Sequence, residues 1–192
     1  MSAARLPTRR ASVGDRELMA QLAAGNLGAL GALHDRYYAA AFGIVTHAGV
    51  ERGDADDVVQ EVFMKLIQLA PRFDGRESAR PWILGIAWRM ALHRRRGVQR
   101  WLRLLEEALV AAPPRAPRSP EDIAASSQEW TSFARRVGCL PTRMQAAFIL
   151  VEIEGLSGEE AARALGIPVA TVWTRLHHAR KRMTSGVEGG EP

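Results

Sequence analysis

The residues best suited to chemistry in this sequence are carboxylates, arginines and histidines, and they are grouped along the chain. Carboxylates are concentrated between Glu51 and Glu61, and paired carboxylates can serve as a general acid and a general base. No nucleophile, metal-ligand set or phosphate-binding loop accompanies them in the sequence. We therefore predict that this acidic segment forms no active site and that its charge serves binding.

Arginine is concentrated in a second segment, from Ser78 to Leu105, which holds seven arginines and no carboxylate. A third segment, from Ala161 to Val187, holds five lysines and arginines and again no carboxylate. Over the whole chain lysine plus arginine exceed aspartate plus glutamate by 26 to 21, for a net charge of +5. Because basic patches attract polyanions, we interpret the two basic segments as sites for nucleic acid and the acidic segment as a site for protein.

The third segment also has the pattern of a helix-turn-helix. Ser157 and Glu160 have the spacing of a reciprocal capping pair at a helix start, Gly166 is placed to end that helix, and Pro168 turns the chain. The second helix repeats apolar residues at helical spacing on one face, at Val172, Leu176, Ala179 and Met183. Its other face is basic and polar, which is typical of a helix that reads DNA. The alternative is a helical hairpin with a solvated cationic face.

Helix patterns also dominate the rest of the chain, so the predicted fold class is all-α. The predicted helix starts are marked by capping residues or by a proline in the first turn: Asp15, Asn26, Asp54, Pro81, and Thr142 with Gln145.

Between the two basic segments the composition changes, because residues 101–127 are rich in proline, alanine and serine. This composition predicts a flexible linker. We therefore expect two small helical domains, at residues 14–100 and 128–185, of which the second contains the helix-turn-helix. Residues 1–13 are predicted to form a disordered tail, and residues 186–192 form a short second tail.

Cys139 is the only cysteine, so the chain has no internal disulfide and no cysteine cluster for a metal. We expect Cys139 to be a small core residue in a reducing compartment. The sequence has no apolar run of about eighteen residues, and its start lacks the apolar centre of a secretion signal. These features predict a cytoplasmic protein with no membrane insertion, no cofactor and no bound metal.

Two stretches together resemble the extracytoplasmic-function sigma factors, the bacterial subunits that give RNA polymerase its promoter specificity. LPTRMQAAFILVEIEGLSGEEAARALGIPVATVWTRLHHARKRM, residues 140–183, resembles the carboxy-terminal domain of that family, and DADDVVQEVFMKLIQLAPRFDGRESARPWILGIAWRMALHRRR, residues 54–96, resembles its amino-terminal domain. The resemblance implies an all-α protein of two domains that catalyses no reaction. It also implies three partners for a chain that is monomeric when free: core RNA polymerase, promoter DNA and an anti-sigma factor.

The resemblance gives the acidic segment a partner, because the matching helix of the family docks on the clamp helices of the polymerase. The implied docking residues are Asp54, Asp56, Asp57, Gln60, Glu61 and Phe63. The alternative for the aspartates is structural, since negative charge in the first turn of a helix is favoured by the helix dipole.

The resemblance also implies that the segment from Phe73 to Arg96 opens the promoter at the minus-ten element and holds the unpaired strand. Arginines would contact phosphates, and aromatic rings would stack on bases. We expect Trp82 in the core and Trp88 exposed, while Arg89 stands where the family commonly has asparagine. The implied minus-ten residues are Phe73, Asp74, Trp88, Arg89, His93, Arg94, Arg95 and Arg96.

In the helix-turn-helix, the resemblance implies contacts with the minus-thirty-five element. Trp173 departs from the family, which commonly has a basic residue there, and two alternatives remain open. Its ring packs against Phe148 or Met144 in the core, or it enters the major groove and contacts thymine methyl groups. The implied residues are Thr171, Trp173, Thr174, Arg175, His177, His178, Arg180 and Arg182, with the last two arginines assigned to phosphates or to the adjoining helix.

Two other classes of protein are alternatives to a sigma factor. A helix-turn-helix regulator that acts without docking on polymerase would need a dimerisation helix or an effector pocket, and a nucleic-acid enzyme would need carboxylates beside the basic helix. Neither feature is found in the sequence. The adjacent His177 and His178 also cannot chelate one metal ion from a single helical face.

Overall fold

The computed structural model describes residues 13–75, 78–108, 133 and 135–185, and all regular structure in these ranges is helical. The predicted all-α fold is confirmed. An amino-terminal unit comprises α1 (Asp15–Ala23), α2 (Leu27–His47), α3 (Arg52–Leu69), the short 3₁₀ turn η1 (Ala70–Arg72) and α4 (Arg80–Ala108). A carboxy-terminal unit comprises α6 (Thr142–Phe148), the π-helical turn η3 (Ile149–Ile153), α7 (Gly158–Leu165) and α8 (Val169–Ser185).

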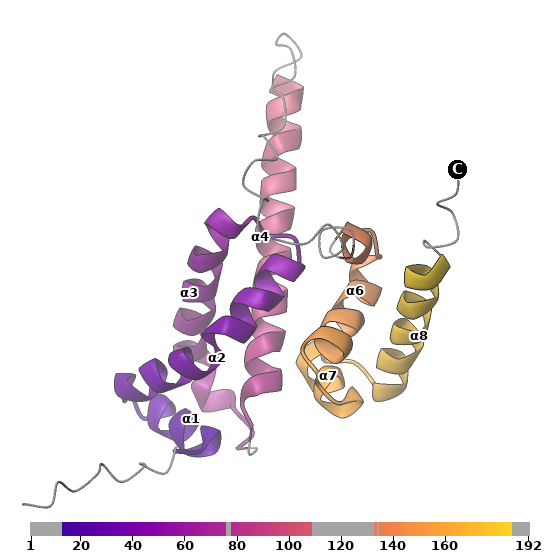
Figure 1. The fold of residues 1–192 in the computed structure, drawn as a ribbon. Coiled ribbons are helices and arrows are strands. Elements are labelled where there is room, and N and C mark those ends of the chain that lie inside the picture. Colours follow the sequence, from indigo (N-terminus) through magenta and orange to yellow (C-terminus); the bar gives the residue numbers. More distant parts are fainter. Residues whose placement is uncertain (1–12, 76–77, 109–132, 134, 186–192) are drawn as a thin grey trace, which may run out of the picture.

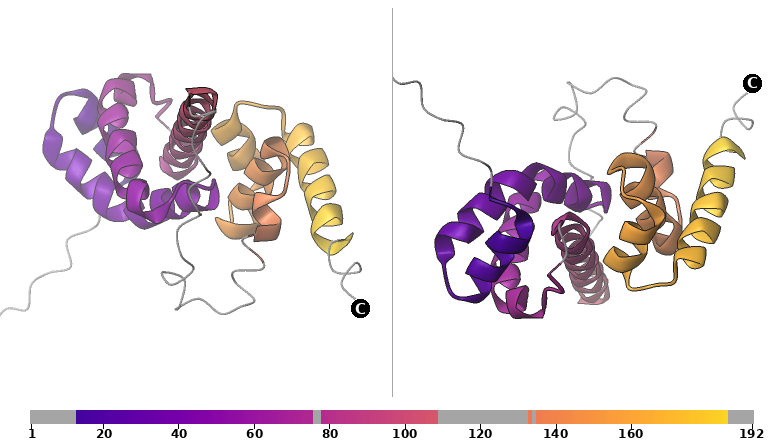
Figure 2. Two further views of the ribbon diagram at one scale, coloured as in Figure 1. Left: turned by 90° about the horizontal axis from the view of Figure 1, so that it is seen from above. Right: turned by 90° about the horizontal axis from the view of Figure 1, so that it is seen from below.

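The long helix α4 stands between the two units (Figure 1). It packs against α2 and α3 on one side and against α7 on the other. Seen along α4, the helices α1–α3 lie to one side and α6–α8 to the other (Figure 2). The buried apolar side chains of the described residues consequently form one connected cluster that includes both units.

A buried carboxylate ties the amino-terminal unit together. Asp15 is 5% exposed, and it accepts hydrogen bonds from the Arg36 guanidinium, the Tyr37 hydroxyl and, at 2.8 Å, the Ala79 backbone N–H. Burial and the hydrogen bond to Asp15 raise the pKa of Tyr37 to about 12. The prediction that Asp15 caps α1 is wrong, because Gly14 precedes the helix and makes no side-chain cap. The carboxylate instead turns inward toward three donors.

Three predicted helix boundaries are confirmed by their hydrogen bonds or backbone angles. The Gly28 N–H donates to Asn26 Oδ1 at 2.9 Å, which caps α2. Ser157 and Glu160 form both bonds of the capping box of α7. Gly166 ends that helix in the left-handed conformation with φ 67°, which a residue without a side chain adopts at little energetic cost. Pro81 lies in the first turn of α4 as predicted.

Two further predicted caps are wrong. The helix α3 begins at Arg52, after Glu51, so Asp54 lies inside its first turn. The helix α6 begins after Pro141 with no side-chain cap. Its residue Gln145 is 2% exposed and donates to the backbone carbonyl of His47, at the end of α2 in the other unit.

Parts of the predicted domain organisation lie outside the described residues, namely the linker from residue 109 on and the tails at residues 1–12 and 186–192. The helix α4 continues into the predicted linker as far as Ala108. Cys139 is exposed, so its prediction as a core residue is wrong. None of the helices in the described ranges has the length and hydropathy needed to cross a lipid bilayer.

Candidate functional site

One face of α3 is acidic and open to solvent. Asp57, Gln60 and Glu61 are exposed there, and Met64 beside them is 62% exposed. Because these residues are three or four positions apart, they share one face of the helix. They line a hollow of about 520 Å³ that also includes Lys65 of α3. Met64 was not among the predicted docking residues. Its exposure could have been predicted, because it is an apolar residue that lies off the buried stripe of α3.

The other three predicted docking residues face neighbouring helices. Phe63 is 3% exposed, and its ring centroid lies 4.8 Å from that of His34. The assignment of Phe63 to the docking surface is therefore wrong, because its side chain belongs to the core. Asp54 pairs with Arg94 at 3.6 Å. Asp56 accepts a hydrogen bond from the Tyr38 hydroxyl, and this bond raises the pKa of Tyr38.

The three consecutive arginines of α4 point in different directions. Arg94 forms the ion pair with Asp54 described above, and Arg95 Nη1 donates to the carbonyl of Ala48 at 2.6 Å. Ala48 ends α2, so Arg95 supplies a cation where a helix leaves its last carbonyls unpaired. Arg96 is exposed. Of the three, Arg96 is the one whose position leaves it open to an external phosphate.

The two tryptophans of α4 are placed opposite to the sequence prediction. Trp88 is 4% exposed, because α4 is covered on two sides and a helix covered in this way buries more than one apolar stripe. Trp82 is only partly buried, and its ring centroid lies 5.5 Å from that of Phe73. The aromatic surface beside Asp74 is therefore the Phe73–Trp82 pair, and Trp82 was missed as a site residue.

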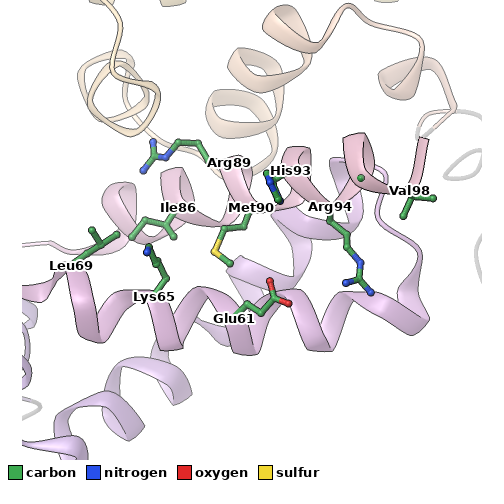
Figure 3. Close-up of a pocket in the computed structure, with 10 residues that line it drawn as sticks. Glu61, Lys65, Leu69, Ile86, Arg89, Met90, His93, Arg94 and Val98 are labelled. Atoms are coloured by element: carbon green, nitrogen blue, oxygen red, sulfur yellow. The ribbon is translucent and has the colours of Figure 1, made fainter. Parts of the chain in front are cut away.

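A groove of about 650 Å³ connects the acidic face of α3 to the minus-ten segment. Figure 3 shows Glu61 of α3 and Met90 of α4 extending into it from opposite walls. The same groove is lined by Arg89, His93 and Arg94. The two surfaces that the sequence assigned to different partners therefore adjoin each other in the amino-terminal unit.

The predicted reading face of α8 is open. Trp173, Thr174, His177, His178 and Arg182 are exposed, whereas Val172, Leu176 and Ala179 on the opposite face are fully buried. Thr171 and Arg175 lie at the edge and are partly buried. Arg180 turns to the adjoining helix instead, where its Nε donates to Glu152 at 2.9 Å.

Of the two alternatives for Trp173, the structure contradicts the core assignment and does not test the groove contact. This residue is 48% exposed, so its assignment to the core is wrong. Its ring lies against the backbone of Gly158, at the first residue of α7, and a Cβ on Gly158 would come within 2.5 Å of Trp173 Cζ2. The missing side chain of Gly158 therefore makes room for the indole, which stands at the edge of the reading face. Whether it reads a base stays a prediction.

Comparison with known proteins identifies the family. The family model "Sigma-70 region 2" matches residues 33–101, and the model "Sigma-70, region 4" matches residues 131–183. The chain is 31% identical to the RNA polymerase sigma factor CnrH of Cupriavidus metallidurans over 177 residues, which cover 89% of this chain and 93% of the relative. It is 30% identical to the ECF RNA polymerase sigma-E factor of Haemophilus influenzae, with coverage of 91% and 95%.

Solved structures show the same fold. The structure of CnrH in complex with the cytosolic domain of CnrY matches with a TM-score of 0.69 and 27% identity, covering 92% of this chain and 99% of that chain. The sigma factor RpoE from Bartonella quintana, in complex with the anti-sigma factor NepR, matches with a TM-score of 0.64 at 19% identity, over 82% and 96% of the two chains.

The arrangement and the matches together define a sigma-70 family initiation factor. Within this family, the chain belongs to the extracytoplasmic-function sigma factors, as its sequence predicted. It binds RNA polymerase and directs promoter-specific initiation of transcription. Sigma factors are initiation factors and not catalysts in themselves.

Proposed function

We propose that this sigma factor docks on core polymerase through the open face of α3, formed by Asp57, Gln60, Glu61 and Met64. The observation that carries the proposal is the exposure of Met64, 62%, within a polar surface. An apolar centre with a polar rim is the usual arrangement of a protein interface. Asp54 and Asp56 of the same helix are bonded to Arg94 and Tyr38.

Two further surfaces contact the promoter. In the amino-terminal unit, the partly exposed rings of Phe73 and Trp82 stack on unpaired bases of the minus-ten element, and Arg96 contacts a phosphate. Base stacking on an aromatic ring contributes about 1–3 kcal/mol per base. In the carboxy-terminal unit, the exposed face of α8 enters the major groove at the minus-thirty-five element, with Trp173, Thr174 and His177 toward the bases.

The remaining partners and properties follow from this role. An anti-sigma factor binds this chain and competes for its polymerase-binding and DNA-binding surfaces. The existence of such a partner is supported by the complexes of similar sigma factors with CnrY and with the anti-sigma factor NepR. The chain itself catalyses no reaction. It acts in the cytoplasm, where core polymerase and promoter DNA are found.

Titration of core polymerase with a labelled sigma factor tests the docking surface. We expect the double substitution Gln60→Ala with Glu61→Ala to weaken core binding about tenfold, which corresponds to about 1.4 kcal/mol, and to leave helix content unchanged. The matched control is Asp35→Ala, which removes one exposed carboxylate from α2. Equal core affinity of the double variant and the control would overturn the docking assignment.

A further inference from the structure

The indole of Trp173 reaches from α8 to the start of α7. Gly158, the first residue of α7, is buried, and a Cβ on it would come within 2.5 Å of Trp173 Cζ2, 2.7 Å of Cε2 and 3.0 Å of Nε1. Contacting carbon atoms prefer a separation of about 3.5–4.0 Å, so a side chain at position 158 would displace the ring. The position of the indole therefore depends on a glycine in the other helix of the helix-turn-helix.

The backbone on both sides of this contact is held in place. The capping box fixes the first turn of α7, because the Ser157 N–H donates to Glu160 at 2.8 Å and the Glu160 N–H donates to Ser157 Oγ at 3.2 Å. On α8, Val172 and Leu176 are fully buried and hold the helix against the core. Because a tryptophan side chain has only two rotatable bonds, an indole seated between two fixed backbones loses little freedom when it contacts DNA.

The side of the indole that meets Gly158 is the side that carries its nitrogen. Cζ2, Cε2 and Nε1 are the ring atoms nearest to a Cβ placed on that glycine. The Nε1–H is the only hydrogen-bond donor of a tryptophan side chain. The opposite side of the ring consists of carbon atoms, and Trp173 is 48% exposed. The packing therefore turns the donor toward α7 and an apolar surface outward.

The first turns of α8 expose further carbon surface beside the indole. Val169, four residues before Trp173 and therefore on the same side of the helix, is 37% exposed. The hydroxyl of Thr174 donates to the carbonyl of Ala170 at 3.0 Å, so its proton is used within α8. The exposed side chains of residues 169–174 consequently offer carbon surface rather than hydrogen-bond donors. These turns meet the base edges when a recognition helix enters the major groove, and the apolar group that the groove presents is the thymine methyl.

We propose that Gly158 is a positioning residue for promoter reading. It seats the Trp173 indole so that the carbon side of the ring, next to Val169, contacts the methyl group of one thymine in the minus-thirty-five element. The inference rests on the proposed placement of α8 in the major groove at that element. Because Gly158 acts through the indole, a change at position 158 alters the readout only while Trp173 is present.

The test uses Gly158→Ala, Trp173→Ala and the variant that combines them, each in the full-length protein. Gly158→Ala places a methyl group where the ring lies, and the half-exposed ring moves outward while the buried stripe of α8 stays in place. The matched control is Gly138→Ala in the same unit, because Gly138 is helical and exposed and a Cβ on it meets no atom within 4 Å. Both glycine substitutions raise helix propensity. Thermal melting of all four variants checks that the fold is retained.

The probe is a promoter duplex selected from genomic fragments by holoenzyme that contains the parent protein. Each thymine of its minus-thirty-five element is replaced in turn by uracil, which removes one methyl group and keeps the base pair. We expect one of these replacements to weaken binding by the parent holoenzyme about fourfold, the effect of losing one buried carbon group. Gly138→Ala shows the same loss. Gly158→Ala, Trp173→Ala and the combined variant bind the thymine and uracil duplexes equally.

Three results would overturn the inference. A parent holoenzyme that binds every uracil duplex as tightly as the thymine duplex makes no methyl contact. A folded Gly158→Ala variant that keeps the parent's preference for thymine shows that Gly158 does not position the ring. A further loss of promoter affinity when Gly158→Ala is added to Trp173→Ala shows that Gly158 acts by a route other than the indole.

The proposed function is tested separately on the same duplexes. Thr174→Ala with His177→Ala removes two other side chains of the reading face, and binding is measured to duplexes with one base pair altered at a time. Base preference equal to the parent's in this variant and in Trp173→Ala would remove α8 from the element and overturn the inference with it. Altered preference in Thr174→Ala with His177→Ala, combined with uracil duplexes that bind normally, overturns only the methyl contact.

Discussion

The polar residues between the helices of the amino-terminal unit and those on the open face of α8 are placed in opposite ways. In the amino-terminal unit, Asp15, Asp54 and Arg95 are tied to neighbouring helices by hydrogen bonds or ion pairs. In the carboxy-terminal unit, the polar face of α8 stays open, and His177 and His178 are exposed. Arginine, for example, is bonded to a neighbouring helix at Arg95 and faces outward at Arg182, so residue type alone does not separate structural from binding roles.

The largest expected effect on stability comes from Asp15, which is buried in the amino-terminal unit. We expect Asp15→Ala to lower the free energy of unfolding by about 3–5 kcal/mol, because each buried donor left without an acceptor, the Tyr37 hydroxyl and the Ala79 N–H, costs about 1–3 kcal/mol. Arg36, Tyr37 and the Ala79 N–H would lose their common acceptor. Urea denaturation measures the effect, and Asp35→Ala is the control. An unfolding midpoint equal to that of the control would mean that Asp15 does not hold the unit together.

Arg95 and Arg96 are adjacent in α4, and they allow a structural role of arginine to be compared with a DNA-binding role. Arg95→Ala leaves the carbonyl of Ala48 without its cationic donor, and we expect a loss of about 1.5–3 kcal/mol of stability. Arg96→Ala should leave stability unchanged and reduce the slope of log promoter affinity against log salt by about 0.7–0.9, the contribution of one phosphate contact. Salt titrations of promoter binding, paired with urea denaturation, separate the two roles. The same salt slope in Arg96→Ala and in the parent would return Arg96 to the solvated end of a basic helix face.

Trp173 tests the open face of the carboxy-terminal unit. We expect Trp173→Ala to leave the melting temperature nearly unchanged, because the ring is 48% exposed. It should lower discrimination at one base pair of the minus-thirty-five element by about 1–3 kcal/mol. Binding to a set of promoter duplexes, each altered at one position, measures this discrimination. Intact base preference combined with a large fall in melting temperature would show that the indole serves only to pack against Gly158.

His47 gives the smallest expected effect, and it concerns the junction of the units. Burial lowers the pKa of His47 below its ordinary value of 6.5, so the folded protein holds the neutral ring while the unfolded chain takes up a proton near pH 6.5. Stability is therefore complete above pH 6.5 and falls as the pH is lowered through that value toward the folded pKa. Melting temperatures at pH 7.5 and 5.5 should differ less in His47→Gln than in the parent, with His34→Gln as the control. An equal difference in both variants would assign the acid sensitivity to other groups.

The sequence predicted most of the fold because local signals specify most of it. The capping box at Ser157 and Glu160, the cap at Asn26 and the left-handed Gly166 depend on residues a few positions apart, and all three were confirmed. The open face of α8 followed from the periodicity of its apolar residues. The errors at Asp15, Gln145 and Trp88 share a different cause. Asp15 and Gln145 form hydrogen bonds with residues distant in sequence, and Trp88 lies on a helix that is covered on two sides. Helical periodicity in the sequence does not predict contacts between distant helices.

The errors in the predicted site residues also arise from contacts between helices. Phe63 was assigned to docking on the resemblance to the family, although it lies on the apolar stripe of α3, and the structure buries it against His34. The exposure of Met64 could have been predicted from the sequence, because this residue lies off the buried stripe of α3. The exchange of roles between Trp82 and Trp88 depends on which sides of α4 are covered, and α4 packs against α7 as well as against α2 and α3.

The sigma function itself is tested most directly by transcription in vitro. The reaction contains genomic fragments and core polymerase from the bacterium that encodes this protein, and it is run with and without the protein. Mapping of the transcript starts should show sites that depend on the protein and that share two sequence elements at a constant spacing upstream. The Gln60→Ala, Glu61→Ala variant should lose these starts at limiting protein concentration and the Asp35→Ala control should retain them. Identical transcript starts with and without the protein, under conditions where another sigma factor directs initiation from the same fragments, would contradict the account.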